Sequence, residues 1–333
     1  MVKPNLLSAR EPERAVTTHP SLVQAVVEEV KELGAIPLIG DSPGGVEKGI
    51  QRVWENTGMA KVSEITGAEL LSFEKSGVVE KRAPSGKRYW VAKPSAECDA
   101  IISLPKLKTH TLCLMTCALK NMFGVIPGFR KGEYHKQAPK PKDFAEIVVD
   151  IYSVVRPQIS LVDGVVAMEG DGASSGDPKY LGIFLASEDA VALDAVCSHL
   201  MGLKPEEVEI TAEAAKRGLG KIRLDQIEVV GEDLDGFKGL DFQLPSNRFL
   251  RLIPKFLVNL LAPYIWVRPA ILDGNCTNCN VCVENCPVKT IHPGDPTPTY
   301  DYNDCINCMC CHELCPHRAV YLEKSWLSRK IGR

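Results

Sequence analysis

Two copies of one cysteine pattern near the end of this 333-residue chain constrain its fold more than any other feature. Each copy reads Cys-x2-Cys-x2-Cys-x3-Cys-Pro, the first starting at Cys276 and the second at Cys305. Three thiolates from one tight loop reach three corners of a cubane cluster, whereas the cysteine before the proline is carried away from that loop. This spacing is typical of proteins with two [4Fe–4S] clusters, in which the fourth cysteine ligates the other cluster.

Each cluster is therefore predicted to take three cysteines from one copy and one from the other. The first is assigned Cys276, Cys279, Cys282 and Cys315, and the second Cys286, Cys305, Cys308 and Cys311. The spare Cys310 is expected to be a packed or weakly exposed thiol, and Asn278, Asn280, Asn307 and nearby amides are expected to donate to cluster sulfurs. Zinc sites use other spacings, and a disulfide framework suits a short secreted chain.

Residues 272–324 resemble bacterial-type two-cluster ferredoxins, which implies a small α+β domain. A larger domain is expected at 1–244, an apolar linker helix at 245–271 and a tail at 325–333. The net charge of −3 predicts no electrostatic footprint for nucleic acid. Reduced thiolates and oxygen-labile clusters suit the cytoplasm, the chain starts with no apolar signal region, and no apolar run is long enough to span a membrane.

Patterns typical of strands and helices alternate through the first part of the chain. Short apolar runs predict strands at 35–39, 70–73, 100–104, 159–162, 181–186 and 227–230. Periodic apolar residues predict helices at 19–33, 112–123, 143–155, 189–200 and 205–217, and residues 78–92 are expected to form a hairpin. The alternation favours an α/β fold with a mostly parallel open sheet and helices on both faces.

The first residues suggest a missing strand. Lys3, Pro4 and Asn5 have the look of residues that leave a strand, yet no strand is expected before them. A start codon assigned too late is the simplest hypothesis, and it predicts that the first strand of this domain is absent or supplied differently.

Several short polar motifs carry a family resemblance. They lie at 3–7 (KPNLL), 18–20 (THP), 40–43 (GDSP), 106–110 (KLKTH), 118–121 (ALKN), 162–164 (VDG), 168–172 (MEGDG) and 192–195 (ALDA). Together they resemble the domain-of-unknown-function 362 family over about residues 1–235, a family that often carries a ferredoxin-like tail. The family's name leaves its reaction unassigned, and its typical members have extra residues before the first motif.

The same motifs predict a ligand site, because they follow predicted strands and the carboxyl ends of parallel strands share one edge of a sheet. Catalytic roles are predicted for Lys106, Lys108, His110, Asp163 and Glu169. Contacts to a substrate or cation are predicted for Asp41, Ser42, Lys120, Asn121 and Asp171. Lysines facing carboxylates suit an anionic substrate and a hard cation such as Mg²⁺, and a histidine with an ordinary pKa suits acid–base work.

Simpler interpretations of these motifs stay open. Lysines after a strand are often solvated, and Asp-Gly is often only a turn. Asp194 is harder to dismiss, because it lies within an apolar helical pattern and a buried carboxylate needs a partner. Neither a P-loop, nor a Gly-x-Gly-x-x-Gly fingerprint, nor a flavin motif is present in the sequence.

The apolar segment 247–272 is expected to dock on the larger domain rather than on a membrane or partner, although both stay open. The whole sequence predicts an iron–sulfur oxidoreductase that passes electrons between a redox partner protein and a small anionic substrate. Two alternatives remain: a non-enzymatic protein that transfers electrons or carries clusters, and a non-redox enzyme whose clusters are structural.

Overall fold

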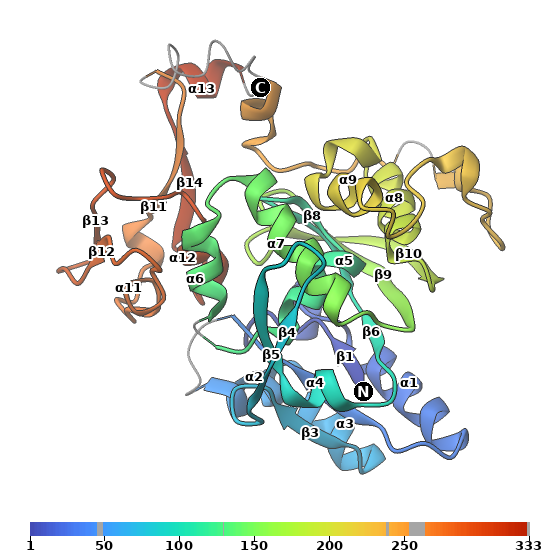
Figure 1. The fold of residues 1–333 in the computed structure, drawn as a ribbon. Coiled ribbons are helices and arrows are strands. Elements are labelled where there is room, and N and C mark those ends of the chain that lie inside the picture. Colours follow the sequence, from blue (N-terminus) through green and yellow to red (C-terminus); the bar gives the residue numbers. More distant parts are fainter. Residues whose placement is uncertain (45–48, 129, 238–239, 253–263, 332–333) are drawn as a thin grey trace.

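A computed structural model describes residues 1–44, 49–128, 130–237, 240–252 and 264–331 (Figure 1). Within them, an eight-stranded sheet has the order β3-β2-β1-β6-β9-β7-β8, with β10 paired to β9. Its strands are β1 (Val2–Pro4), β2 (Leu38–Asp41), β3 (Glu69–Ser72), β6 (Ile102–Leu104), β7 (Lys106–His110), β8 (Leu114–Thr116), β9 (Ile159–Glu169) and β10 (Asp177–Ser187). β8 and β10 are antiparallel to their neighbours, and the remaining pairings are parallel.

Two separate apolar clusters flank this sheet, which is why helices cover both of its faces. One cluster is built by α1 (Pro20–Glu32), α2 (Ile50–Asn56) and α3 (Met59–Thr66). The helices outside that cluster are α4 (Lys93–Glu97), α5 (Ala118–Asn121), α6 (Arg130–Gln137), α7 (Pro141–Val154), α8 (Ala190–Leu200) and α9 (Glu209–Lys216). The predicted α/β fold with a mostly parallel sheet is confirmed.

Local sequence signals explain several boundaries. The His19 side chain accepts a hydrogen bond from Ser21 N at the start of α1, Pro20 occupies the first turn, and Gly34 follows the helix with a φ of 78°. The predicted hairpin is formed by β4 (Val78–Arg82) and β5 (Arg88–Ala92), with Gly86 at a φ of 87° in its turn. Short 3-10 helices lie at Pro12–Arg14, Met122–Val125, Pro205–Glu207, Leu224–Gln226, Leu234–Phe237, Arg248–Leu252 and Asp273–Asn275.

A second lobe, residues 267–331, lies beside α6 (Figure 1). It contains β11 (Val267–Ile271), α11 (Val281–Glu284), β12 (Ile291–His292), β13 (Thr299–Tyr300), α12 (Cys310–Leu314), β14 (Val320–Lys324) and α13 (Trp326–Ile331). β11 pairs antiparallel with β14, and β12 pairs antiparallel with β13. Positive φ angles recur at matching positions of the two cysteine copies: Asn278 and Asn307, Asn280 and Met309, Lys289 and Arg318. The two copies are thus a structural repeat as well as a sequence repeat.

Three predictions about secondary structure are wrong. Residues 112–123 do not form one helix, because β8 pairs with β7 as a hairpin before α5 begins. Residues 227–230 form no strand, and Val229 and Val230 are exposed rather than buried in a sheet. Lys3 and Pro4 lie within β1 itself, which pairs with both β2 and β6. Of the predicted linker helix at 245–271, residues 253–263 lie outside the described residues, Arg248–Leu252 is a short 3-10 helix, and Val267–Ile271 is a strand rather than a helix.

The two lobes are held together by hydrogen bonds between side chains and main chain. Arg10 donates from the first lobe to the carbonyl oxygens of Cys315 and Pro316. In the opposite direction, Arg318 donates to the carbonyl of Ser175 and to Asp177 Oδ1, the latter at 3.1 Å. The peptide groups around the predicted cluster ligands therefore form part of the contact between the lobes.

Candidate functional site

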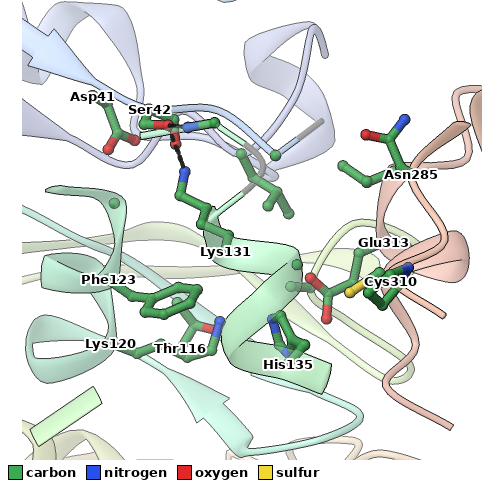
Figure 2. A pocket seen from close by; sticks show the side chains of 18 of the residues that line it. Asp41, Ser42, Thr116, Lys120, Phe123, Lys131, His135, Asn285, Cys310 and Glu313 are labelled. Carbon is green, nitrogen blue, oxygen red and sulfur yellow. Dashed lines mark hydrogen bonds between the residues drawn. The ribbon is translucent and has the colours of Figure 1, made fainter. Parts of the chain in front are cut away.

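A cavity of about 310 Å³ lies between the lobes, at the carboxyl ends of β1 and β2. Figure 2 shows its walls: Asp41 and Ser42 on one side, α5 and α6 below, and Cys310 with Glu313 facing them from the second lobe. Five of the predicted site residues line it: Asp41, Ser42, Lys108, Lys120 and Asn121. The other five do not: Lys106, His110, Asp163, Glu169 and Asp171.

Lys106 and Asp163 form a buried ion pair instead of facing the cavity. Lys106 Nζ lies 2.9 Å from Asp163 Oδ2, and both side chains are 1% exposed. The same carboxylate oxygen accepts a hydrogen bond from His19 N at 2.8 Å. Burial lowers the pKa of Lys106, and the charge of Asp163 opposes that shift. The pair therefore joins β7, β9 and the start of α1, which is a structural role.

His110 is also buried, behind the cavity wall. Its Nδ1 accepts hydrogen bonds from Leu112 N at 3.0 Å and Cys113 N at 3.3 Å, and its Nε2 lies 3.0 Å from Glu313 Oε1. Burial, followed by the nearby Lys120, lowers the pKa of His110 to about 4. The expectation that His110 titrates near neutrality is therefore wrong, and the ring is neutral at pH 7.

Glu169 and Asp171 tie the end of β9 to the segment after residue 240. Glu169 Oε2 accepts a hydrogen bond from Gln243 N at 2.9 Å and lies 2.9 Å from Lys179 Nζ. Asp171 accepts hydrogen bonds from Ser246 N and Ser246 Oγ at 2.7 and 2.9 Å. The carboxylate cluster expected for Mg²⁺ is not formed there. Across the part of the chain that the structure describes, no group of three or more His, Cys, Asp or Glu is gathered as around one metal ion.

Contacts of Lys3, Asp41 and Asn121 stabilise the part of the cavity wall at the ends of β1 and β2. Lys3 Nζ lies 2.8 Å from Asp41 Oδ1, and Asp41 Oδ2 accepts a hydrogen bond from Leu6 N at 2.7 Å. Asn121 Nδ2 donates to Ser103 Oγ at 3.0 Å. Gly124 is required here, because a Cβ at this position would lie 2.1 Å from Asp41 Oδ1. These contacts neutralise Asp41 and fix the ends of β1 and β2.

Lys108 and Lys131 approach the cavity with oxygen partners but without a paired carboxylate. Lys108 Nζ donates to Asn5 Oδ1 at 2.8 Å and to Val16 O at 2.6 Å. Lys131 Nζ donates to the carbonyl and hydroxyl of Ser42, the latter at 2.8 Å (Figure 2). Burial is the main reason that the pKa of Lys108 falls to about 7 and that of Lys131 to about 8.

Sequence reasoning missed Lys131, His135 and Glu313. The first two lie four residues apart on α6, a helix that was not predicted, although that spacing places two side chains on one helix face. Glu313 lies between two predicted cluster ligands, and nothing in the sequence shows that α12 turns it toward the first lobe. Packing within the first lobe brings Lys131 and His135 to the cavity that Lys108 and Lys120 line, and packing between the lobes brings Glu313.

The predicted cluster cysteines line two small recesses, one for each assigned set. The first contains Cys276, Cys279, Cys282 and Cys315, and the second contains Cys286, Cys305, Cys308 and Cys311. Main-chain amides approach three of the sulfurs: Asn278 N to Cys276 at 3.4 Å, Thr290 N to Cys286 at 3.4 Å, and Ala319 N to Cys315 at 3.2 Å. Four thiols and amide donors around an apolar recess are the donor set that a cubane cluster uses, so these residues fit the group.

One cysteine connects the second recess to the cavity. Cys286 lines both the second recess and the cavity wall. The spare Cys310 is half-buried and also lines the cavity, with its sulfur beside Glu313 in Figure 2. The site predicted for the second cluster is therefore adjacent to the lysine-lined cavity.

Comparisons with known proteins identify a family and relatives of this chain. The model of the family described as Domain of unknown function (DUF362) matches residues 1–199, a shorter range than expected, which ends before the cysteine-rich lobe. Thylakoid-associated protein sll1697 of Synechocystis sp. (strain ATCC 27184 / PCC 6803 / Kazusa) is 34% identical over 221 residues, covering 66% of this chain and 68% of that protein.

Among solved structures, that of the lactate racemase apoprotein from Thermoanaerobacterium thermosaccharolyticum is similar to this chain. It has 12% sequence identity and a TM-score of 0.41, and the alignment covers 61% of this chain and 48% of that chain. Among the described residues, no helix combines the length and apolar character needed to cross a membrane.

Proposed function

The chain belongs to the DUF362 family, whose description assigns no reaction, and on that premise we propose that it is an iron–sulfur oxidoreductase. The two recesses hold [4Fe–4S] clusters, and the cavity between the lobes holds a small anionic substrate. A redox partner protein exchanges electrons with the clusters in a reducing compartment such as the cytoplasm. Either direction of electron flow is compatible with these residues.

The position of Cys286 carries this proposal. As a ligand of the second cluster it belongs to one recess, and as a wall residue it borders the cavity. Electron transfer weakens steeply with distance, so a cluster ligand in the cavity wall is an effective route to a bound substrate. A [4Fe–4S] cluster supplies one-electron transfer at a potential tuned by nearby charges and amide donors.

Residues of the cavity bind the substrate and can donate a proton to it or accept one from it. Lys108, Lys120 and Lys131 give the cavity three cationic groups, while Asp41 is neutralised by Lys3. The pKa of Lys108, lowered to about 7 mainly by burial, allows its Nζ to hold or release a proton near neutral pH. His135 stays neutral, because burial lowers its pKa to about 4.

Iron content and reoxidation test the proposal. Protein purified without oxygen is expected to hold close to eight iron atoms per chain, because two [4Fe–4S] clusters hold four each. Replacing the ligand in Cys286→Ser should remove or alter one cluster in electron paramagnetic resonance spectra, whereas Cys310→Ser, the matched control, should leave both intact. Reduced protein is then mixed with candidate carboxylates and phosphate esters, and cluster reoxidation is followed by absorbance.

The outcomes separate the alternatives. Reoxidation by a small anion supports an enzyme, and reoxidation only by a second protein supports an electron-transfer or cluster-carrying role. Turnover that survives loss of both clusters supports a non-redox enzyme with structural clusters. Far fewer than eight irons in anaerobically prepared protein overturns the proposal altogether.

A further inference from the structure

Two buried polar atoms in the cavity wall have neither a hydrogen-bond partner nor an ion-pair partner among the described residues. They are Thr116 Oγ1 and His135 Nδ1, on side chains that are 3% and 6% exposed. Both residues line the cavity between the lobes. A buried polar group without a partner is unfavourable because its lost hydration is not replaced, so two in one wall point to a ligand that supplies their missing hydrogen bonds.

The ammonium group of Lys120 lies in the same wall. Throughout the described parts of the chain, no hydrogen bond or ion pair is formed by its Nζ. Its charge nevertheless acts on its surroundings, because it contributes to the lowered pKa values of Lys108, Lys131 and His135, each of which is due mainly to burial. The pKa of Glu313 is lowered against the effect of its burial, first by His110 and then by Lys120, so the Glu313 carboxylate and Lys120 attract each other, although no ion pair joins them. Lys120 is thus a cation without a direct partner among the described residues.

The fold brings these three residues together from separate elements. The β7–β8 hairpin pairs Thr116 with Lys108, and α5 begins directly afterwards and carries Lys120. His135 comes from α6, where its ring stacks on Phe144 with centroids 4.3 Å apart. Figure 2 shows Thr116, Lys120 and His135 on one side of the cavity. Stacking fixes the ring, so its free nitrogen is preorganised.

We propose that Lys120, Thr116 and His135 form an oxyanion subsite that binds a carboxylate or phosphate group of the substrate. This deepens the proposed function, on which it rests, by naming the group through which the substrate is held. An ammonium, a hydroxyl and a neutral ring N–H are the donors that such a group requires. An anion between Lys120 and Lys108 also relieves their mutual repulsion. Because Asp41 is paired with Lys3, Glu313 from the second lobe is the buried acidic side chain that the anion must approach.

Binding of two probe anions tests the subsite without any redox reaction. Inorganic phosphate and malonate are titrated separately into the anaerobically purified full chain, at low salt, by isothermal calorimetry. At least one of them is expected to bind, and the probe that binds identifies the source as phosphate or carboxylate. Lys120→Met should weaken binding at least about tenfold, because a charge-assisted hydrogen bond is lost. The exposed Lys61→Met is the matched control and should bind like the wild type.

Thr116→Val distinguishes a subsite from a structural role. Since the Thr116 hydroxyl has no partner in the fold, its removal should leave thermal stability unchanged or raised, yet weaken anion binding several-fold. If Lys120→Met fails to fold, Lys120→Arg and Thr116→Val decide the question, the former retaining affinity and the latter losing it.

The subsite is overturned if neither probe binds the wild type, or if the Lys120 and Thr116 variants that fold bind as tightly as the wild type. Its failure is distinguishable from failure of the proposed function. Anion binding without any reoxidation sinks the redox proposal and leaves the subsite. Cluster reoxidation that is unchanged in Lys120→Met overturns the subsite and leaves the redox proposal.

Discussion

Two groups of lysines near the same sheet edge have opposite environments. Lys106 has a carboxylate 2.9 Å away and is completely enclosed by the fold. Lys108, Lys120 and Lys131 face the cavity, where their partners are carbonyls, a hydroxyl and an amide oxygen, or nothing. The difference teaches that residue type and strand position do not identify a binding lysine. A lysine paired within the fold stabilises the fold, whereas an unpaired one is available to a ligand.

The largest expected effect comes from breaking the buried pair. Asp163→Asn should lower the free energy of unfolding by about 3–5 kcal/mol, because it leaves the Lys106 ammonium buried without a counter-charge. Urea denaturation measures this loss. Glu64→Gln is the control, since it removes an exposed pair with Lys61 that contributes at most about 1 kcal/mol. Equal losses in the two variants would contradict a structural role for the Lys106–Asp163 pair.

Lys108 should make stability depend on pH. Its folded pKa of about 7 lies below the ordinary value of 10.5, so between these values the unfolded chain binds more protons than the folded one. The free energy of unfolding therefore rises with pH through this window, by at most about 1.4 kcal/mol per pH unit for one proton. Below pH 7 Lys108 is protonated in both the folded and the unfolded chain, so the full cost of burying its charge lowers the free energy of unfolding.

Denaturation curves at several pH values check this expectation. Lys108→Met should remove the rise that the wild type shows above pH 7. If the rise in stability persists unchanged in this variant, other groups cause it. Lys131 is then the first to test, because it is also a buried lysine, with a pKa of about 8.

A substitution at Asp194 should displace the helix in the cavity wall without removing any side chain that lines the cavity. Its carboxylate accepts hydrogen bonds from Ala118 N at 2.7 Å and Leu119 N at 3.3 Å, which caps the helix that carries Lys120. Asp194→Ala should cost about 1–2 kcal/mol, the range of a lost cap. Asp194→Asn keeps an acceptor and should cost less.

The two Asp194 variants should also differ from the wild type in pH dependence. Burial raises the pKa of Asp194 from 3.8 to about 7, so the folded state binds more protons between these values. This carboxyl therefore contributes a fall in stability as the pH rises through that window, which Asp194→Asn should abolish. Thermal melts from pH 4 to pH 8 measure it. A fall that remains in Asp194→Asn would show that other acids cause it.

The smallest effect is expected at Lys120. Lys120→Met should change the free energy of unfolding by less than about 0.5 kcal/mol, since no hydrogen bond or ion pair with a described residue is lost. Paired with Asp163→Asn in the same urea series, it sharpens the contrast between a lysine used by the fold and one left for a ligand. A loss comparable to that of Asp163→Asn would erase the distinction.

The sequence alone determined the features that depend on short-range spacing. The alternation of apolar runs predicted the α/β fold, and residues 78–92 predicted the β4–β5 hairpin, because period and turn chemistry act within a few residues. The cysteine spacing likewise predicted two sets of four residues, and each set lines one recess. In all these cases the pattern that supports the prediction lies within short segments or a repeated motif.

The tertiary structure decided which polar residues serve the fold and which face a ligand. Lys106 and Lys108 are equivalent in the sequence pattern, yet only the position of β9 gives Lys106 a carboxylate. Residues 114–116 leave the predicted helix because pairing with β7 satisfies their backbone, and this places Thr116 at the cavity. Pairing of charges and closure of a cavity depend on contacts between distant segments, and a local pattern carries no record of them.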